Sequence, residues 1–424
     1  MNQSTLSEKP FLCVSIVFMA EVIAIMLFWS FLPTHFQINE NSDYIGSYKP
    51  VAVNILNGNG IVNDDGSLAT SYPPGYSLIL ATLFGFSEIS GISERIVIKG
   101  FILFCMGLSC VIIFLLADSV WGRSPALISS SLWIFCPFNL WLTKQPNSTI
   151  PFLVMLFCCL YFLYWILRYK IQSGKIFFLI GLMAGLTMLI RPIALLFGLV
   201  MAVIIWFVYD KLKWHLCIFL ITMLLFGNIT VLLPWIGWVY NKTGRIILLS
   251  ENGTPSMRDG LTFVVIHKGY RNGAWVPQDV EMLMQDMNDK IDELQSYSDI
   301  FSMLKKKIYE CPLTIGKLFL IKALRCWYAT DSQRFETPIA LIQFFYIIVI
   351  GWSGRIAWKQ GGDARRLVII ILFITMYFWS VATLASLSIL RYMLPSFGLM
   401  LVLTSALFHR WLSQIKDSRQ TLIN

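Results

Sequence analysis

Residues 34–99 read THFQINENSDYIGSYKPVAVNILNGNGIVNDDGSLATSYPPGYSLILATLFGFSEISGISERIVIK and directly follow the first apolar segment of the chain. The stretch is polar, and it is rich in Asn, Asp and Gly. Gly58, Gly60 and Gly66 stand among Asn and Asp residues, which predicts tight turns with positive φ.

Two short helices are expected within this polar stretch. Residues 44–56 place apolar side chains at roughly helical spacing, which indicates an amphipathic helix lying on a membrane surface. Residues 74–86 are apolar but too few to cross a bilayer, so they predict a re-entrant or surface helix.

The composition of the whole chain places it in a membrane. Hydrophobic residues make up 57% of the 424 residues, charged residues 13%, and the mean hydropathy is +0.67. Soluble domains carry about 25% charged residues. The net charge of +9 is no argument for a nucleic-acid partner, because Lys and Arg collect in the cytoplasmic loops of membrane proteins.

Hydropathy predicts an all-α integral membrane protein, with residues 1–424 as a single polytopic domain of about ten transmembrane helices. Residues 33–97 are expected to form a long first exterior loop that carries the amphipathic surface helices. Residues 240–336 are expected to form a large second exterior loop. The ten expected spans are 11–32, 96–117, 125–142, 150–167, 176–190, 192–208, 216–239, 338–352, 367–387 and 392–407.

The distribution of basic residues predicts the orientation. With both termini in the cytoplasm, the loops 118–124, 168–175, 210–215 and 355–366 and the C-terminal tail face inward and are rich in Lys and Arg, whereas the short exterior loops contain only Lys144, Arg191 and Arg391. Counting 74–86 as a full span would turn two of these basic loops outward, which favours a surface helix there. We therefore expect a multi-pass protein of the plasma (cytoplasmic or inner) membrane.

Three features of the sequence leave their roles open. Glu21 lies inside the first span and is either a functional intramembrane carboxylate or a side chain that snorkels. Cys311 and Cys326 lie in a polar region, and a disulfide between them is neither required nor excluded. His267 is a weak candidate metal ligand, and no cysteine pair has zinc-ligand spacing, so a divalent cation stays an open question.

An ordered set of motifs resembles the GT-C glycosyltransferase superfamily. The similarity is to the dolichyl-phosphate-mannose–protein mannosyltransferase family (glycosyltransferase family 39) and its bacterial relatives, such as the lipid A aminoarabinose transferase. Three departures, at Ser71-Tyr72, at Gln145-Pro-Asn147-Ser148 and at Tyr240, leave the donor and the metal dependence open. The matching motifs are Ser42-Asp43-Tyr44, Ala52-x-x-Ile55-Leu56-x-Gly58-x-Gly60, Tyr72-Pro-Pro-Gly-Tyr76, Phe84-Gly85 with Arg95, the Gly181 to Arg191-Pro192 segment, Pro234-Trp235 with Asn241 and Gly244, Lys317 with Lys322 and Trp327, and Arg391-Tyr392-x-x-Pro395.

The resemblance implies an inverting hexosyl- or pentosyltransferase of the cell envelope. Its donor would be a polyprenyl-phosphate-linked sugar, and its acceptor would be a hydroxyl of a glycolipid, polysaccharide or protein at the exterior face of the membrane. Two other classes compete with this reading. One is a polysaccharide polymerase or ligase of another membrane family, and the other is a transporter, which usually shows repeats and broken helices at mid-bilayer.

The resemblance also implies the site residues. Transfer needs a base for the acceptor hydroxyl and cations for the departing lipid phosphate. Asp43 is the expected general base, and its alternative role is a helix N-cap. Asp64 and Asp65 are more typical of a turn, and Glu88 and Glu94 are weaker candidates. The residues expected to bind substrate are Tyr44, Tyr72, Arg95, Arg191, Lys322 and Arg391, with Arg325 a weaker one.

The second exterior loop has an amphipathic pattern of its own. Residues 280–304 alternate Met, Leu and Ile with Asp, Glu and Gln at helical spacing, which predicts one amphipathic helix that covers the site or receives the acceptor. The lysines 305–307 are more typical of a solvated or lipid-headgroup face.

Overall fold

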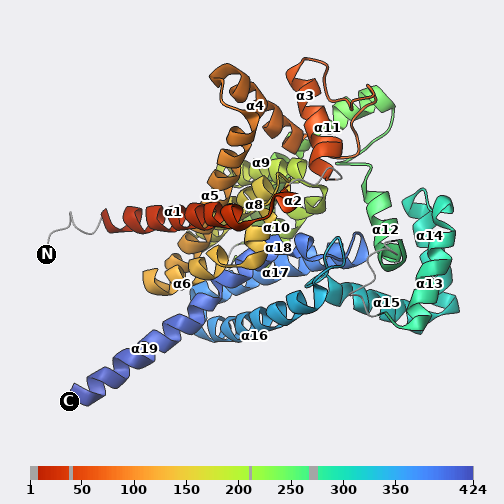
Figure 1. Cartoon of the computed structure of the whole chain (residues 1–424). Coiled ribbons are helices and arrows are strands. Elements are labelled where there is room, and N and C mark those ends of the chain that lie inside the picture. Colours follow the sequence, from red (N-terminus) through yellow and green to blue (C-terminus); the bar gives the residue numbers. More distant parts are fainter. Residues whose placement is uncertain (1–7, 38–41, 210–212, 267–275, 424) are drawn as a thin grey trace. The chain divides into compact units, whose positions relative to one another are not determined.

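The computed structural model describes residues 8–37, 42–209, 213–266 and 276–423 (Figure 1). These residues are predominantly helical, and their one β-type pairing is an isolated bridge between Val62 and Leu68. The helices are α1 (Glu8–Phe31), α2 (Thr34–Gln37), the π-helix η2 (Tyr44–Tyr48), α3 (Lys49–Leu56), α4 (Gly75–Ser90), α5 (Glu94–Trp121), α6 (Arg123–Ile134), α7 (Pro137–Leu142), α8 (Thr149–Tyr169), α9 (Gly174–Ile190), the 3-10 helix η3 (Pro192–Ala194), α10 (Phe197–Val208), α11 (Trp214–Thr243), α12 (Gly253–Ile266), α13 (Gln278–Asp289), the 3-10 helix η5 (Ile291–Glu293), α14 (Tyr297–Glu310), α15 (Pro312–Arg325), α16 (Glu336–Gln360), α17 (Gly362–Leu384), α18 (Leu390–Val402) and α19 (Thr404–Ile423).

The multi-pass all-α membrane fold is confirmed. Among the described residues, seven helical segments are long and apolar enough to cross a membrane. Two shorter apolar helices, Gly174–Ile190 and Pro192–Val208, accompany them. Helix α4 has 16 residues and does not belong to the seven, in keeping with the expected re-entrant or surface helix.

The expected span 125–142 is divided into two helices, α6 and α7. Pro137 occupies the first turn of α7, and Cys136 before it has extended backbone angles of φ −67° and ψ 116°. Helical geometry is disfavoured for a residue that precedes proline, because the proline ring clashes with its backbone. Hydropathy alone does not register this break.

The chain folds into two compact units. Unit 1 contains residues 1–249, 350–371 and 398–424, and unit 2 contains residues 250–349 and 372–397. Helices α16, α17 and α18 contribute residues to both units. The two units are described separately below.

Glycines allow the tightest helix packing in unit 1, between α9 and α11. A Cβ atom added to Gly181 would lie 2.0 Å from the carbonyl oxygen of Leu224. One added to Gly227 would lie 2.2 Å from the carbonyl oxygen of Phe178. The glycines of the Gly181 to Arg191 motif therefore serve backbone-to-backbone approach, as small residues commonly do between membrane helices.

Several helix ends of unit 1 meet at one end of the bundle. The loops that follow α5, α8, α10 and α16 are joined there, and these loops carry many of the basic residues expected to face the cytoplasm. The contacts are Trp121 Nε1 to Gln360 Oε1 at 2.7 Å, Arg168 Nε to Asp363 Oδ2 at 3.2 Å, and Tyr209 Oη to the Ile171 carbonyl oxygen at 2.9 Å.

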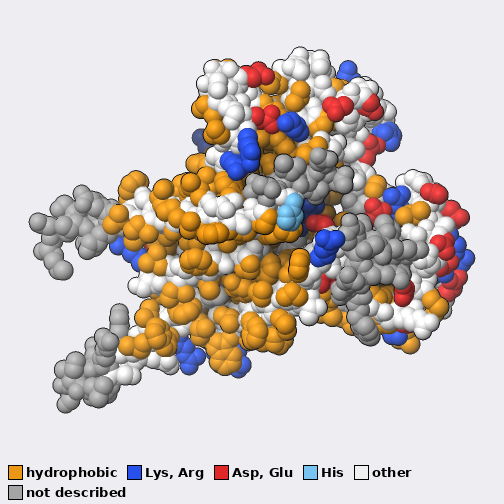
Figure 2. All heavy atoms as spheres, in the orientation of Figure 1, with side chains coloured by type: hydrophobic (Ala, Val, Ile, Leu, Met, Phe, Trp, Pro, Cys, Tyr) orange, Lys and Arg blue, Asp and Glu red, His pale blue; other side chains and the backbone are white. Residues whose placement is uncertain are grey.

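The surface of unit 1 separates apolar helix faces from polar loops. Helix α1 exposes large apolar side chains such as Phe11 (76% exposed) and Phe31 (84% exposed), as a lipid-facing helix does. Figure 2 shows hydrophobic side chains along α1, whereas acidic and basic side chains gather over α3, α4 and the loop between them.

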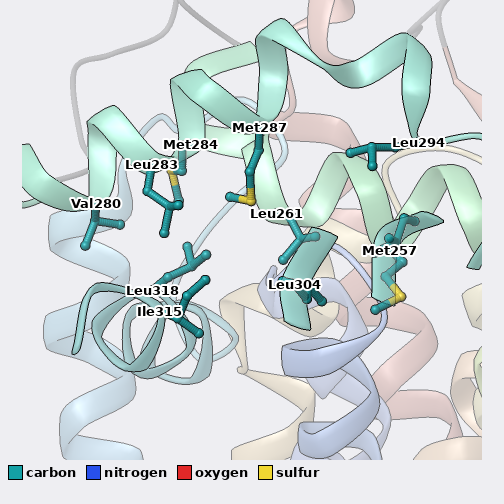
Figure 3. Close-up of a cluster of buried hydrophobic side chains, with 11 residues drawn as sticks. Met257, Leu261, Val280, Leu283, Met284, Met287, Leu294, Leu304, Ile315 and Leu318 are labelled. Carbon is teal, nitrogen blue, oxygen red and sulfur yellow. The ribbon is translucent and has the colours of Figure 1, made fainter. Parts of the chain in front are cut away.

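Unit 2 has a hydrophobic core between α12, α13, α14 and α15 (Figure 3). The expected single helix 280–304 is wrong, because the chain forms α13 and α14 with a break between them. Ser296 and Asp299 make a reciprocal capping box that starts α14. The core side chains are Met257, Leu261, Val280, Leu283, Met284, Met287, Leu294, Ile300, Leu304, Ile315 and Leu318.

Candidate active site

A cavity of about 350 Å³ opens in unit 1, where the end of α1 meets the first polar loop, the start of α5 and the loop after α7. Segments more than a hundred residues apart in the chain therefore form one site. The lining residues are Trp29, Ser42, Tyr44, Ile45, Lys49, Glu94, Arg95, Ile98, Lys99, Ile102, Thr143, Lys144, Gln145 and Pro146.

The cavity lining combines several basic side chains with apolar ones. Among the lining residues, Lys49, Arg95, Lys99 and Lys144 are cationic, and Glu94 is the carboxylate. Ile98, Ile102 and the Trp29 ring supply apolar surface. This combination suits a ligand with an anionic group and a hydrocarbon tail.

Glu94 organises the acidic part of this wall. Its Oε1 atom accepts hydrogen bonds from Lys49 Nζ at 2.7 Å and from Tyr44 Oη at 3.3 Å. Burial, with a further contribution from the Glu94 carboxylate, raises the pKa of Tyr44 above its ordinary value. Tyr44 is therefore a phenol at neutral pH and can donate a hydrogen bond.

Two lysines of the wall are held against aromatic rings. Lys99 Nζ lies 4.8 Å from the centre of the Trp29 ring, and Lys144 Nζ lies 4.4 Å from that of Trp141. Cation–π contacts of this length orient a cation relative to the ring.

Asp43 lies at the surface next to the cavity, between the lining residues Ser42 and Tyr44. Its Oδ1 atom accepts a hydrogen bond from Tyr72 Oη at 3.2 Å, which joins two of the predicted site residues. The Tyr72 ring in turn packs 4.9 Å from that of Tyr48. Within the described residues the Asp43 side chain makes no cap hydrogen bond to the helix that follows it.

The Tyr72-Pro-Pro-Gly-Tyr76 segment is fixed against the end of α9. A Cβ atom on Gly75 would lie 2.5 Å from the carbonyl oxygen of Leu189, so a larger residue at this position would push the two segments apart. Tyr76 is 2% exposed and packs its ring 4.9 Å from that of Tyr48. This packing sets the position of Tyr72.

Arg191 is buried at the end of α9. One of its guanidinium nitrogens donates to the hydroxyl of Thr149, at the start of α8, and the guanidinium lies 6.0 Å from the centre of the Phe152 ring. Arg191 is not one of the cavity-lining residues. Its predicted contact with the donor stays a prediction.

Lys322 and Arg391 lie in unit 2. Lys322 is 3% exposed, and its Nζ donates to the carbonyl oxygens of Gly260 at 2.7 Å and Ser386 at 3.2 Å. Burial lowers the pKa of Lys322 to about 7. The guanidinium of Arg391 lies 5.7 Å from the centre of the Tyr392 ring. The predicted substrate contacts of both side chains stay predictions.

The weaker sequence candidates have identifiable surroundings. Asp65 accepts hydrogen bonds from the Ser67 amide at 2.9 Å and hydroxyl at 2.6 Å, which is the turn role expected for it, and these bonds lower its pKa. Glu88 is exposed on α4. Arg325 forms a buried, bidentate ion pair with Glu336 at 2.9 Å.

Metal binding and the disulfide were also open in the sequence. Within the described ranges, no group of three or more His, Cys, Asp or Glu side chains is placed to hold a metal ion, and His267 lies outside those ranges. Cys311 and Cys326 are both free thiols. Cys311 Sγ lies 3.3 Å from the Lys307 carbonyl oxygen, and Cys326 Sγ lies 3.5 Å from the Thr383 hydroxyl.

Sequence reasoning missed Trp29, Lys49, Lys99 and Lys144 as parts of the site. A signal for Lys99 was present, because it follows Arg95 by four residues and so lies on the same helix face. Lys49 and Lys144 had no comparable signal, since only the fold brings their loops to one cavity.

Comparison with known proteins supports the resemblance. Residues 71–238, less than half of the chain, match the family model described as dolichyl-phosphate-mannose-protein mannosyltransferase. No curated protein sequence matches the chain.

The chain is similar to two solved structures. One is the archaeal oligosaccharyltransferase AglB from Archaeoglobus fulgidus, in complex with an inhibitory peptide and a dolichol-phosphate. It has a TM-score of 0.53 and 12% sequence identity, and the match covers 94% of this chain and 50% of that one, so the chain spans about half of its length. The other is ArnT from Cupriavidus metallidurans bound to undecaprenyl phosphate, with a TM-score of 0.44, 12% identity and coverage of 95% and 78%.

Proposed function

We propose that this protein is a membrane glycosyltransferase that transfers a sugar from a polyprenyl-phosphate donor to an acceptor hydroxyl. The observation that carries the proposal is the cavity described above, which four basic side chains line together with the apolar side chains of Trp29, Ile98 and Ile102. The family match over residues 71–238 and the fold shared with a dolichol-phosphate-binding protein point to the same class of donor.

The basic side chains would bind and stabilise the donor phosphate. Arg95 offers a planar pair of N–H donors that fits two phosphate oxygens, and Lys99 and Lys144 supply point charges beside it. As the sugar leaves, negative charge grows on the phosphate, and fixed cations stabilise that charge best. The isoleucines of α5 would contact the first isoprene units.

Transfer would proceed by a single displacement. The acceptor oxygen attacks the anomeric carbon, the bond from that carbon to the phosphate oxygen breaks, and the lipid phosphate leaves with the bonding electrons. Attack opposite to the leaving group inverts the anomeric configuration. Asp43 would take the proton of the acceptor hydroxyl, and the hydrogen bond from Tyr72 would orient its carboxylate.

The expected setting is the exterior face of a plasma membrane, with a glycolipid, polysaccharide or protein as acceptor. In this setting the polar loop residues of the site would lie on the side of the membrane that carries the acceptors of the cell envelope.

The direct test is binding of undecaprenyl phosphate, which has the lipid-monophosphate end common to such donors. Purified protein in detergent is titrated with this lipid, and the complex is followed by native mass spectrometry. Arg95→Gln and Lys99→Gln should each weaken binding about tenfold to a hundredfold, because each removes a charge-assisted contact.

The matched control is Arg123→Gln, at the start of α6 and outside the cavity lining, which should bind as the wild type does. Undecaprenyl diphosphate serves as the competing ligand. Preference for the monophosphate supports the proposal, whereas a strong preference for the diphosphate would favour a polymerase or ligase. Unchanged binding by both cavity variants would remove the cavity as the donor site.

A further inference from the structure

Glu21 is a fully buried carboxylate at the middle of a membrane-spanning helix. It lies ten residues from either end of the apolar segment Phe11–Phe31, a distance of about 15 Å along the helix. Its side chain is 0% exposed, although α1 otherwise shows much of its surface to lipid. Snorkelling, which was one expectation for this residue, is therefore excluded by its position.

The partner of Glu21 is Asn139 of α7, and one oxygen atom of each side chain lacks a hydrogen-bond partner among the described residues. Asn139 Nδ2 donates to Glu21 Oε1 at 2.8 Å and to the Trp133 carbonyl oxygen at 3.1 Å. Glu21 Oε2 and Asn139 Oδ1 are both buried, and neither has a hydrogen-bond partner among the described residues. Both atoms are acceptors if the carboxylate is ionised.

A proton on the Glu21 carboxylate would supply the missing hydrogen-bond donor. On Glu21 Oε2 it would remove a charge that hydrocarbon surroundings disfavour, and it would supply a donor for Asn139 Oδ1. A carboxylic acid and a primary amide can form a planar ring with two hydrogen bonds. The bond from Asn139 Nδ2 to Glu21 Oε1 is one half of that ring.

We propose that Glu21 is a neutral carboxylic acid that pairs with Asn139 and thereby holds one wall of the cavity in place. Asn139 lies one helical turn before Thr143, the first lining residue of the loop after α7. The same helix α1 also binds that loop directly, because Trp29 Nε1 donates to the Thr143 carbonyl oxygen at 3.0 Å. Lys144 and Gln145 are positioned by these two contacts from α1. Glu21 is thus a positioning residue.

The protonation state can be measured directly. Infrared difference spectra of the purified full-length protein at neutral pH, wild type against Glu21→Gln, should show one carboxylic-acid C=O band that the variant lacks. Exposed carboxyl groups are ionised under these conditions and give no such band. Absence of the band from the wild type would overturn the assignment of a neutral acid.

The positioning role is tested by hydrogen–deuterium exchange of the segment 137–146. Glu21→Ala leaves buried Asn139 groups without partners, so exchange there should rise about tenfold to a hundredfold. Glu21→Gln keeps an acceptor for Asn139 Nδ2 and adds a donor for Asn139 Oδ1, so it should exchange as the wild type does. Ile23→Ala, at a half-exposed site two residues away, is the matched control and should be silent.

Exchange in Glu21→Gln as fast as in Glu21→Ala would contradict the pairing. If Glu21→Ala does not fold, the Gln variant and the infrared band still decide the question. The relevance to catalysis rests on the proposed function, but neither readout needs a substrate. Failure of donor binding with an intact band and exchange pattern would therefore count against the proposed function alone.

Discussion

Asp43 has two possible roles in the sequence, a general base and a helix N-cap. A carboxylate before a helix is favoured as an N-cap, but the Asp43 side chain makes no cap hydrogen bond within the described residues, and it accepts one from Tyr72 at 3.2 Å instead. Asn caps helices nearly as well as Asp, whereas it cannot act as a base.

Asp43→Asn should therefore lower sugar transfer about 10²- to 10⁴-fold while leaving the protein folded, because it removes the basic oxygen and little else. The measurement is transfer from labelled polyprenyl-phosphate sugars by purified protein, with the melting temperature recorded for each variant. Asp64→Asn, in the exposed turn of the same loop, is the control and should be near wild type. Near-normal transfer by Asp43→Asn would shift the search for the base to Glu94, which lines the cavity.

We expect the stability of unit 2 to depend on pH because of the buried Lys322. Burial lowers the pKa of Lys322 to about 7 from its ordinary 10.5, and a neutral amine still has two N–H donors for its two carbonyl partners. Between these two pH values the unfolded chain binds more protons than the folded one, so the free energy of unfolding increases as the pH rises through this window. The increase is at most about 1.4 kcal/mol per pH unit.

Lys322→Met should flatten that part of the stability profile, measured as melting temperatures of the detergent-solubilised protein at several pH values from neutral upward. Lys317→Met on the same helix is the control, because Lys317 is 53% exposed and pairs with Asp279 at the surface. It should keep the wild-type slope. A Lys322→Met profile with the same slope as the wild type would show that this lysine is charged in the folded protein.

At the scale of elements, hydropathy located the apolar segments well and missed their internal breaks. Hydrophobic periodicity measures burial, so it reports where a helix is apolar and not where its backbone stops. The residues that explain these breaks are present in the sequence. Pro137 accounts for the break between α6 and α7, and the capping box of Ser296 and Asp299 accounts for the break before α14. The positive φ angles of Gly58, Gly60 and Gly66, at 78°, 87° and 79°, confirm the expected turns.

The packing of α9 on α11 yields a prediction about two glycines of one helix. Gly227→Ala would place a methyl group 2.2 Å from the Phe178 carbonyl oxygen, so the helices must separate. Overpacking of this kind costs about 1–3 kcal/mol. Gly237→Ala meets no heavy atom of the described residues within 4 Å, and alanine is the better helix former. In a thermal melt, Gly227→Ala should unfold several degrees below the wild type and Gly237→Ala at or above it. Equal melting temperatures would show that α9 and α11 are not tightly packed.

At the scale of the molecule, the cavity itself was beyond sequence reasoning. Arg95, Tyr44 and Tyr72 were found through motifs, because motif residues are local in the chain. Three further lining residues come from separate parts of the chain: Trp29 from α1, Lys49 from the first polar loop and Lys144 from the loop after α7. Only tertiary packing brings these parts together. Such long-range contacts depend on how all the helices pack, and no short sequence pattern encodes them.

The contacts within unit 1 also show how the broken segment 123–142 runs between the two ends of α5. Residues 94–99 and 143–146 line one cavity, while Trp121, at the far end of α5, bonds to Gln360 at the opposite end. Helices α6 and α7 together therefore return the chain to the cavity end, as one crossing would. His409 Nδ1 lies 3.2 Å from the Trp121 carbonyl oxygen, so the C-terminal helix lies at the end away from the cavity.

This arrangement predicts that the cavity end faces the exterior and the C-terminal helix faces the cytoplasm, because the basic loops lie at the end opposite the cavity. Single cysteines are introduced as Ser90→Cys, Ser302→Cys and Ser413→Cys, all at exposed positions, in a protein without its nine native cysteines. A membrane-impermeant maleimide applied to intact cells should label the first two and spare the third, and all three should react once the membrane is permeabilised. If Ser413→Cys is labelled in intact cells as fast as Ser90→Cys, the C-terminal helix lies on the cavity side of the membrane.

The segment 123–142 would then not act as a single crossing, and the site could not be assigned to the exterior face.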